Sequence, residues 1–216
     1  MTRAGQGLFL VLALGWLGCG AATQDGKQET APAAAAAAAA PVEQKAEATL
    51  SKQFLMKTDK GEILLELDYT KAPKTCANFE HYAAKGHYNG TVFHRVISSF
   101  MIQGGGLDST LSERATDPPI ENEAGNGLKN TRGTIAMART GAVHSATSQF
   151  FINVVDNDFL NFRSPDPQGF GYCVFGHVVK GMEVVDAIRN VPTGNRGMYQ
   201  NVPTQSVLIE SVTLVK

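Results

Sequence analysis

The 216-residue sequence has almost no net charge. It holds 19 Lys and Arg residues against 20 Asp and Glu, which gives a formal charge of −1 at pH 7. Nucleic-acid phosphates are bound mainly by clustered Lys and Arg side chains. The charge balance therefore offers no basis for a nucleic-acid partner, and we expect none.

Cysteine is scarce, and the usual motifs of metal, phosphate and hydrolase sites are missing. None of the three cysteines has a C-x-x-C spacing, and the five histidines form no H-E-x-x-H pattern. Gly104-Gly105-Gly106 lacks the Lys-Ser/Thr of a phosphate loop, so we expect a turn that leaves a strand. His144 lies near Ser145 and Ser148, but no G-x-S-x-G elbow accompanies them. We expect no metal and no cofactor.

The N-terminal apolar run is too short to span a membrane. Leu8–Leu14 lies between a positively charged start and a stretch of small residues, as in a secretory signal peptide, whereas a spanning helix needs about 20 apolar residues. The letters "WLGC", ending at Cys19, resemble a bacterial lipobox, although Trp16 stands where leucine is usual. We expect residues 1–18 to be a signal peptide and Cys19 to be lipidated. The alternative is an ordinary signal peptide cleaved a few residues later.

Residues 19–51 have the composition of a linker. They are rich in Ala, Gln, Glu, Lys and Thr, with eight consecutive alanines at Ala33–Ala40 between two prolines. No apolar stripe could pack against a core, so we expect a flexible stalk. The stalk would connect the domain, in the periplasm, to a membrane. The lipid would be the only part of the protein that contacts that membrane. A soluble periplasmic protein is the alternative.

Residues 52–216 read as one folded domain of many short strands. "QFLMKTDKGEILLELD" predicts a hairpin, because polar and apolar residues alternate on both sides of an Asp-Lys-Gly turn. Two segments, "KAPKTCANFEHYAAKGHY" and "GMEVVDAIRN", have helical spacing. Further strands are expected at residues 91–97, 100–103, 133–138, 149–154, 174–179 and 206–215. Such a pattern is typical of a β-barrel or sandwich with helical caps.

The segment "FHRVISSFMIQGG", Phe93 to Gly105, places polar groups among apolar ones. Strand alternation puts Met101 and Gln103 on one face, with Phe100 and Ile102 on the other. In the preceding strand it groups Phe93 with Arg95 and Ile97. The polar groups could decorate a solvated face or line an apolar pocket, and alternation does not distinguish these two possibilities.

Several blocks taken together resemble the cyclophilin family of peptidyl-prolyl cis-trans isomerases, most closely its bacterial periplasmic type. They are "APKTCANF", "FHRVISSFMIQGG", "NTRGTIAMAR", "SQFFINV", "GYCVFGHVVKGMEVVDAI" and "YQNVP", in that order. The resemblance covers about residues 54–215. It implies a mainly β fold, a closed eight-stranded antiparallel β-barrel capped by two α-helices. It also implies a monomeric isomerase that accelerates X-Pro rotation in unfolded or exported polypeptides and so assists their folding.

The resemblance assigns roles to individual residues. Arg95 matches the catalytic arginine, and His94 before it matches a supporting residue. Ala138 and Arg139 match positions that bind the residue before proline. The remaining substrate-binding positions are Phe100, Met101, Gln103, Gln149, Phe151, Phe159, Leu160 and Tyr172.

Two departures from the family pattern have consequences. Ser98-Ser99 stands where relatives commonly have Pro-Gly, so a looser turn before Phe100 is expected. Phe159 replaces a tryptophan of members that bind cyclosporin tightly, so weak inhibition by cyclosporin is expected.

Some alternatives stay open at this stage. A barrel that only binds proline-containing chains would use the same pocket, although retention of Arg95 favours catalysis. An envelope structural protein anchored by its lipid would not need the pocket at all. Cys76 and Cys173 have apolar neighbours and are expected to be buried, but the sequence leaves their pairing open.

Overall fold

The computed structural model describes residues 50–215. The predicted signal peptide, Cys19 and nearly all of the predicted linker lie outside the described residues. Within the described part of the chain, no helix is long and apolar enough to cross a membrane.

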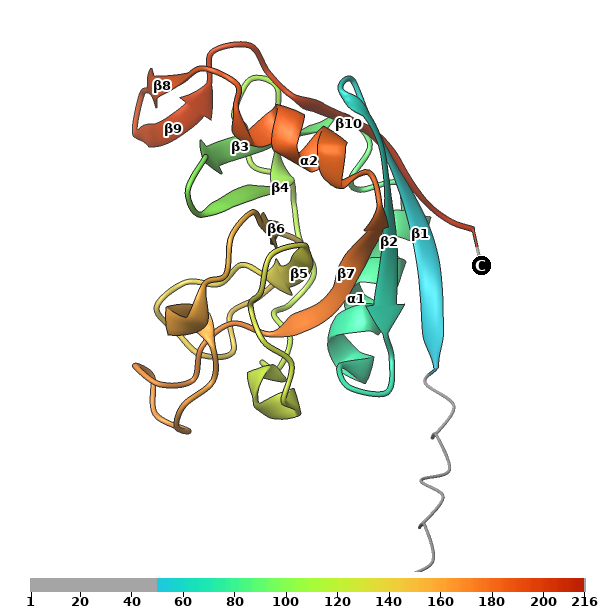
Figure 1. Ribbon diagram of the computed structural model, residues 1–216, viewed down its shortest axis with the longest axis vertical. Coiled ribbons are helices and arrows are strands. Elements are labelled where there is room, and N and C mark those ends of the chain that lie inside the picture. Colours follow the sequence, from blue (N-terminus) through green and yellow to red (C-terminus); the bar gives the residue numbers. More distant parts are fainter. Residues whose placement is uncertain (1–49, 216) are drawn as a thin grey trace, which may run out of the picture. The chain divides into compact units, whose positions relative to one another are not determined.

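Eight strands close into an antiparallel barrel, as predicted (Figure 1). Around the barrel the order is β1-β10-β3-β4-β6-β5-β7-β2. The strands span Ser51–Thr58 (β1), Gly61–Asp68 (β2), Thr91–Ile97 (β3), Met101–Asp108 (β4), Thr134–Met137 (β5), Phe150–Asn153 (β6), Val174–Lys180 (β7) and Leu208–Leu214 (β10). A full ring of pairings leaves no open sheet edge.

Two helices cover the barrel. Helix α1, Pro73–Ala84, packs against β2 and β10, while α2, Met182–Arg189, packs against β2, β3 and β4. Pro73 fits the first turn of α1, where a missing N–H costs nothing. Two short 3₁₀ turns, η1 at Ala124–Asn126 and η2 at Asp158–Leu160, lie in the long connections. Both predicted helices are confirmed.

The interior of the barrel is an aromatic core. The Phe79 ring of α1 lies 5.6 Å from Phe54, 5.0 Å from Tyr88, 5.7 Å from Phe150 and 5.5 Å from Phe175. Apolar burial at about 25 cal/mol per Å² makes such a cluster the main source of stability. A second, smaller cluster, made of Met101, Ala136, Phe151, Leu160 and Val174, lies apart from it.

A β-bulge in β3 corrects the predicted faces of that strand. Phe93 pairs with Gly104 and Arg95 pairs with Gln103, so β3 has one more residue than β4 across this step. The extra residue shifts the alternation. Phe93 therefore packs in the main core, and the prediction that it shares a face with Arg95 and Ile97 is wrong. The bulge turns Arg95 out of the barrel interior.

The glycine run lies within β4 and is not the predicted turn. A Cβ on Gly105, where φ is +84°, would lie 2.7 Å from the Phe150 ring, and one on Gly106 would lie 2.7 Å from Gln149 Cδ. Gly104 would bring a Cβ within 3.0 Å of the Val92 carbonyl oxygen. Close packing, rather than a chain reversal, explains these glycines.

A hairpin outside the barrel was not predicted. Strands β8, Thr193–Arg196, and β9, Tyr199–Pro203, pair with each other next to β3. All four residues of β8 are exposed, so the hairpin has no polar–apolar alternation to reveal it.

Candidate active site

A cavity of about 270 Å³ opens on the outer side of strands β3, β4 and β6. This volume is close to the lower end of the range of small-ligand sites, about 300 Å³. Ten of the twelve residues predicted for the site line it. They are Arg95, Phe100, Met101, Gln103, Ala138, Arg139, Phe151, Phe159, Leu160 and Tyr172.

The floor and one wall of the cavity are apolar. Met101 and Phe151 are held on paired strands and are nearly fully buried, and Leu160 packs against them from η2. The Phe100 ring stacks on the Phe159 ring, with centroids 5.5 Å apart and an angle of 28° between the planes. Phe159 itself is 63% exposed and forms the rim. The cavity therefore offers apolar surface to a small bound group.

Arg95 stands at the polar edge of this cavity. Its Nη1 donates a long hydrogen bond of 3.4 Å to Gln103 Oε1, and Gln103 Nε2 donates to Gln149 Oε1 at 2.9 Å. The guanidinium carbon is 6.0 Å from the centre of the Phe100 ring. Because a guanidinium has five N–H donors, most of those of Arg95 stay available to a bound molecule.

The opposite edge is formed by Ala138, Arg139 and Tyr172. The Arg139 guanidinium lies 4.8 Å from the centre of the Tyr172 ring, and its Nε donates to the Gly171 carbonyl at 2.9 Å. Ala138 donates its backbone N–H to the Gln149 carbonyl at 2.9 Å. These hydrogen bonds fix the position of the Ala138 side of the cavity.

A second hollow adjoins the first. It has a volume of about 140 Å³ and shares Gln103, Ala138 and Arg139 with the main cavity. Gln149, the eleventh predicted residue, lines this hollow and not the main cavity. Thr140, Ser145 and Thr147 complete the lining. None of these three residues was predicted for the site from the sequence.

His94, the twelfth predicted residue, does not line either hollow. Its side chain is 6% exposed, and its Nδ1 atom has no hydrogen-bond partner among the described residues. Burial, with a smaller contribution from the charge of Arg95, lowers the pKa of His94 to about 4. His94 is therefore neutral at pH 7, so Arg95 has no second positive charge beside it.

The turn before Phe100 is closed and not loose. The Phe100 N–H donates to the Ile97 carbonyl at 2.9 Å, and the Phe100 carbonyl accepts from Val154 N and from Asn157 Nδ2. Ser98 and Ser99 therefore occupy an ordinary hydrogen-bonded β-turn. Their departure from the family pattern does not displace Phe100 from the cavity.

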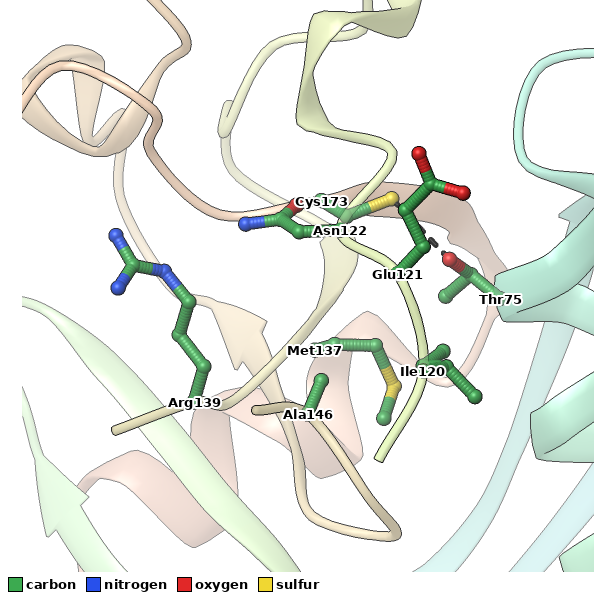
Figure 2. Close-up of a pocket in the computed structure, with 8 residues that line it drawn as sticks. All are labelled: Thr75, Ile120, Glu121, Asn122, Met137, Arg139, Ala146 and Cys173. Carbon is green, nitrogen blue, oxygen red and sulfur yellow. Dashed lines mark hydrogen bonds between the residues drawn. The ribbon is translucent and has the colours of Figure 1, made fainter. Parts of the chain in front are cut away.

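A much smaller cavity also has Arg139 in its lining (Figure 2). Its volume of about 10 Å³ is close to the least that a single water needs. Cys173 and Thr75 meet there, with Sγ and Oγ1 3.4 Å apart. Both Cys173 and Cys76 are buried, free thiols, and burial raises the pKa of Cys173 to about 12. This cavity is too small for a substrate.

Neither hollow of the site has an acidic residue in its lining. Among residues 50–215, no three His, Cys, Asp or Glu side chains are grouped to hold a metal ion. Arg95 can donate hydrogen bonds to the backbone of a bound polypeptide. At the same time, the side chains of that polypeptide can pack on the apolar floor of the cavity. The sequence did not predict the buried asparagines behind the wall, because an asparagine is ordinarily expected at a solvated surface. They are Asn130, Asn153, Asn157 and Asn161.

Comparison with known families and proteins gives a consistent result. The family model described as "Cyclophilin type peptidyl-prolyl cis-trans isomerase/CLD" matches residues 53–214. The chain is 60% identical over 157 residues to peptidyl-prolyl cis-trans isomerase B of Escherichia coli (strain K12), which covers 73% of this chain and 96% of that protein. It is 56% identical over 169 residues to peptidyl-prolyl cis-trans isomerase A of Dickeya dadantii (strain 3937), with 78% and 87% covered.

A solved structure with the same fold is a cyclophilin type peptidyl-prolyl cis-trans isomerase from Cryptosporidium parvum. Its TM-score against this chain is 0.66 at 27% identity, and the match covers 77% of this chain and 98% of that one. A second structure of that protein, in the presence of the dipeptide Ala-Pro, also has a TM-score of 0.66 at 27% identity and covers 76% and 99%.

Proposed function

Because this chain belongs to the cyclophilin type of peptidyl-prolyl cis-trans isomerases, we propose that Arg95 is its catalytic residue and that the cavity beside Arg95 binds the proline ring. The chain is an isomerase that acts on proline-containing polypeptides. The observation that carries the assignment is the position of Arg95, at the edge of an apolar cavity without acidic residues.

Rotation about an X-Pro bond is slow because resonance gives C–N partial double-bond character. The barrier is about 18–20 kcal/mol, and uncatalysed exchange takes tens to hundreds of seconds. At the twisted transition state the resonance is lost and the proline nitrogen regains a lone pair. A hydrogen bond from Arg95 to that lone pair would stabilise only the twisted state, and such selective binding is what accelerates a reaction.

An arginine suits this task better than a group that titrates. Its guanidinium stays charged at any pH the protein meets, so it donates and never competes as a base. One donor placed in a site that excludes water contributes about 2.7–4 kcal/mol, or 10²–10³ in rate. No covalent bond is broken, so neither a nucleophile nor a cofactor is needed.

The other lining residues would hold the two halves of the substrate. Phe100, Met101, Phe151 and Leu160 would grip the ring, while Gln103 would hold the acyl side as the other half rotates. The residue before proline would extend past Ala138 toward the adjoining hollow. The structure of the related Cryptosporidium parvum protein was solved in the presence of the dipeptide Ala-Pro. A short Ala-Pro peptide is therefore a suitable test substrate.

A protease-coupled assay on an Ala-Pro peptide tests the assignment. Arg95→Ala should lower kcat/KM about a hundredfold or more, while Arg196→Ala, on the exposed hairpin, should behave as wild type. Equal kcat/KM for wild type and Arg95→Ala would leave the family membership intact but remove Arg95 from its catalytic role.

The clients proposed for this enzyme are exported polypeptides. The signal-like N-terminus and the lipobox-like "WLGC" at Cys19 support a periplasmic enzyme tethered by a lipid. A soluble periplasmic enzyme is the alternative. Fractionation of cells that express Cys19→Ser decides between them, because loss of membrane association is expected only for the lipoprotein.

A further inference from the structure

Four buried asparagines lie behind the wall of the candidate active site. Asn130 and Asn153 are fully buried, Asn157 is 2% exposed and Asn161 is 9% exposed. None of them lines the cavity. A buried carboxamide is costly unless its donors and acceptor are hydrogen-bonded, so the bonds that these four side chains make show what they hold.

The first part of the network fixes the Phe100 side of the wall. Asn157 Nδ2 donates to the Phe100 carbonyl at 2.9 Å and to Asn153 Oδ1 at 2.7 Å. Asn153 Nδ2 in turn donates to Asn130 Oδ1 at 3.2 Å and to Thr134 Oγ1 at 2.9 Å. The carboxamides therefore run head to tail from the turn before β4 to the start of β5.

The second part fixes the other side of the wall. Asn130 Nδ2 lies 3.2 Å from the Leu160 carbonyl and 3.3 Å from the Tyr172 carbonyl. Asn161 Oδ1 accepts from the Asn130 backbone N–H at 2.7 Å. The network thus ends on the backbone carbonyls of three lining residues, Phe100, Leu160 and Tyr172.

This part of the wall has no strand ladder to hold it. Residues 154–173 contain only the short turn η2, and their buried backbone groups still need partners. By contrast, Met101 and Phe151 on the floor lie in β4 and β6, which pair directly. A few backbone bonds, such as that from the Tyr172 N–H to the Leu160 carbonyl at 2.9 Å, also hold the loop wall, and the asparagine side chains add the links between its two sides.

We propose that Asn157, Asn153 and Asn130 are positioning residues that set the distance between the Phe100–Phe159 stack and the Leu160–Tyr172 side of the cavity. The proposal rests on the cavity being the proline site. The proline ring must be held while Arg95 reaches the nitrogen, and a displacement of about 1 Å can lower a rate by 10². The network acts through the wall, and none of its side chains touches the substrate.

Asn157→Asp is the sharpest perturbation of the network. It keeps the size of the side chain but replaces the Nδ2 donor with an oxygen, which would face the Phe100 carbonyl and Asn153 Oδ1. Asn126→Asp is the control, at a half-buried carboxamide outside the network. Asn126 Nδ2 donates to the Val174 carbonyl at 2.9 Å and Oδ1 accepts from Leu128 N at 3.0 Å, but Val174 does not line the cavity.

Three quantities are measured on the folded full chain of each variant: kcat/KM, the Kd of an Ala-Pro peptide from NMR titration, and the Leu160 methyl chemical shifts. Asn157→Asp should lower kcat/KM about tenfold or more, weaken the peptide Kd and move the Leu160 methyl signals. Asn126→Asp should change kcat/KM by less than about twofold, since it leaves the wall in place.

The positioning role is overturned if Asn157→Asp changes kcat/KM by less than twofold. It is also overturned if Asn126→Asp lowers kcat/KM as much as Asn157→Asp does. If Asn157→Asp does not fold, Asn157→Ala replaces it, because it removes the same Nδ2 donor without adding a charge, and wild-type kcat/KM in that variant overturns the role. Arg95→Ala measured alongside separates the two proposals, because full activity there refutes the role of Arg95 and leaves the comparison of the asparagine variants valid.

Discussion

Acid should weaken the domain through His94, the buried neighbour of Arg95. Burial lowers the pKa of His94 from its ordinary value of 6.5 to about 4 in the folded chain. The unfolded chain therefore binds this proton more readily than the folded chain does. Above pH 6.5 neither form is protonated and nothing is lost. As the pH falls from 6.5 toward 4, His94 binds a proton in the unfolded state but not in the folded state, and the free energy of unfolding falls.

The magnitude follows from the two pKa values. Each tenfold difference in proton affinity is worth about 1.4 kcal/mol, so His94 alone lowers the free energy of unfolding by about 3 kcal/mol once the pH reaches 4. At pH 4.5 the loss is already about 2.5 kcal/mol. This is a large part of the stability of an ordinary domain, about 5–15 kcal/mol.

Urea unfolding of wild type and His94→Gln at pH 7.0, 5.5 and 4.5 tests this reasoning. The glutamine has no proton to gain, so the stability of His94→Gln relative to wild type should rise by about 2–3 kcal/mol between pH 7.0 and 4.5. His177→Gln, at an exposed histidine of β7, is the control for the loss of a histidine as such. A stability difference for His94→Gln that changes by less than about 0.5 kcal/mol over this pH range would refute the assignment of a buried, neutral His94.

Three further predictions concern the rim, the thiols and the N-terminus. Cyclosporin should inhibit the wild-type enzyme only weakly, and Phe159→Trp should strengthen inhibition, which a titration of isomerase activity measures; nanomolar inhibition of the wild type would contradict this. Cys76 and Cys173 should react with a thiol reagent only after unfolding, because both are buried and burial raises their pKa values; a thiol count on the unfolded, unreduced protein that finds neither of them would instead mean that they pair. Cys19→Ser should move the protein from the membrane to the soluble fraction, and unchanged fractionation would exclude a lipid anchor.

The strands were predictable wherever polar and apolar residues alternate without interruption. The predicted bounds of β3, Thr91–Ile97, agree with the structure, and the β1–β2 hairpin follows its Asp-Lys-Gly turn. The bulge at His94 was not predictable, because one extra residue in a strand leaves no mark in the sequence until its partner strand is known. For the same reason Phe93 was assigned to the wrong face.

The glycines of β4 show a different limit. Glycine is usually a turn residue, so Gly104-Gly105-Gly106 was interpreted as the end of a strand. The actual reason for glycine is the nearness of the Phe150 ring and the Gln149 side chain, which lie at and just before the start of β6, more than 40 residues later in the sequence. Such long-range contacts cannot be read from local patterns.

The site was largely predictable because a resemblance, and not periodicity, located its residues. Ten of the predicted residues meet around one cavity, whereas alternation alone left Arg95 between a solvated face and a pocket. The asparagine network escaped notice because Asn157 and Asn161 lie in a connection that reads as a surface loop, and because nothing in the predicted strand 149–154 links Asn153 to the site. Only their burial, and the carbonyls they bind, reveals a connection with the cavity.

The central claim is that Arg95 stabilises the twisted peptide bond and contributes little to binding the planar one. NMR exchange spectroscopy on an Ala-Pro peptide that saturates the enzyme measures the cis-trans rate in the bound state, and a titration gives the Kd. Arg95→Ala should slow bound-state exchange by about 10²–10³ while changing the Kd by less than about threefold. A bound-state rate equal to that of wild type would contradict the claim, and so would a loss of activity explained wholly by a weaker Kd.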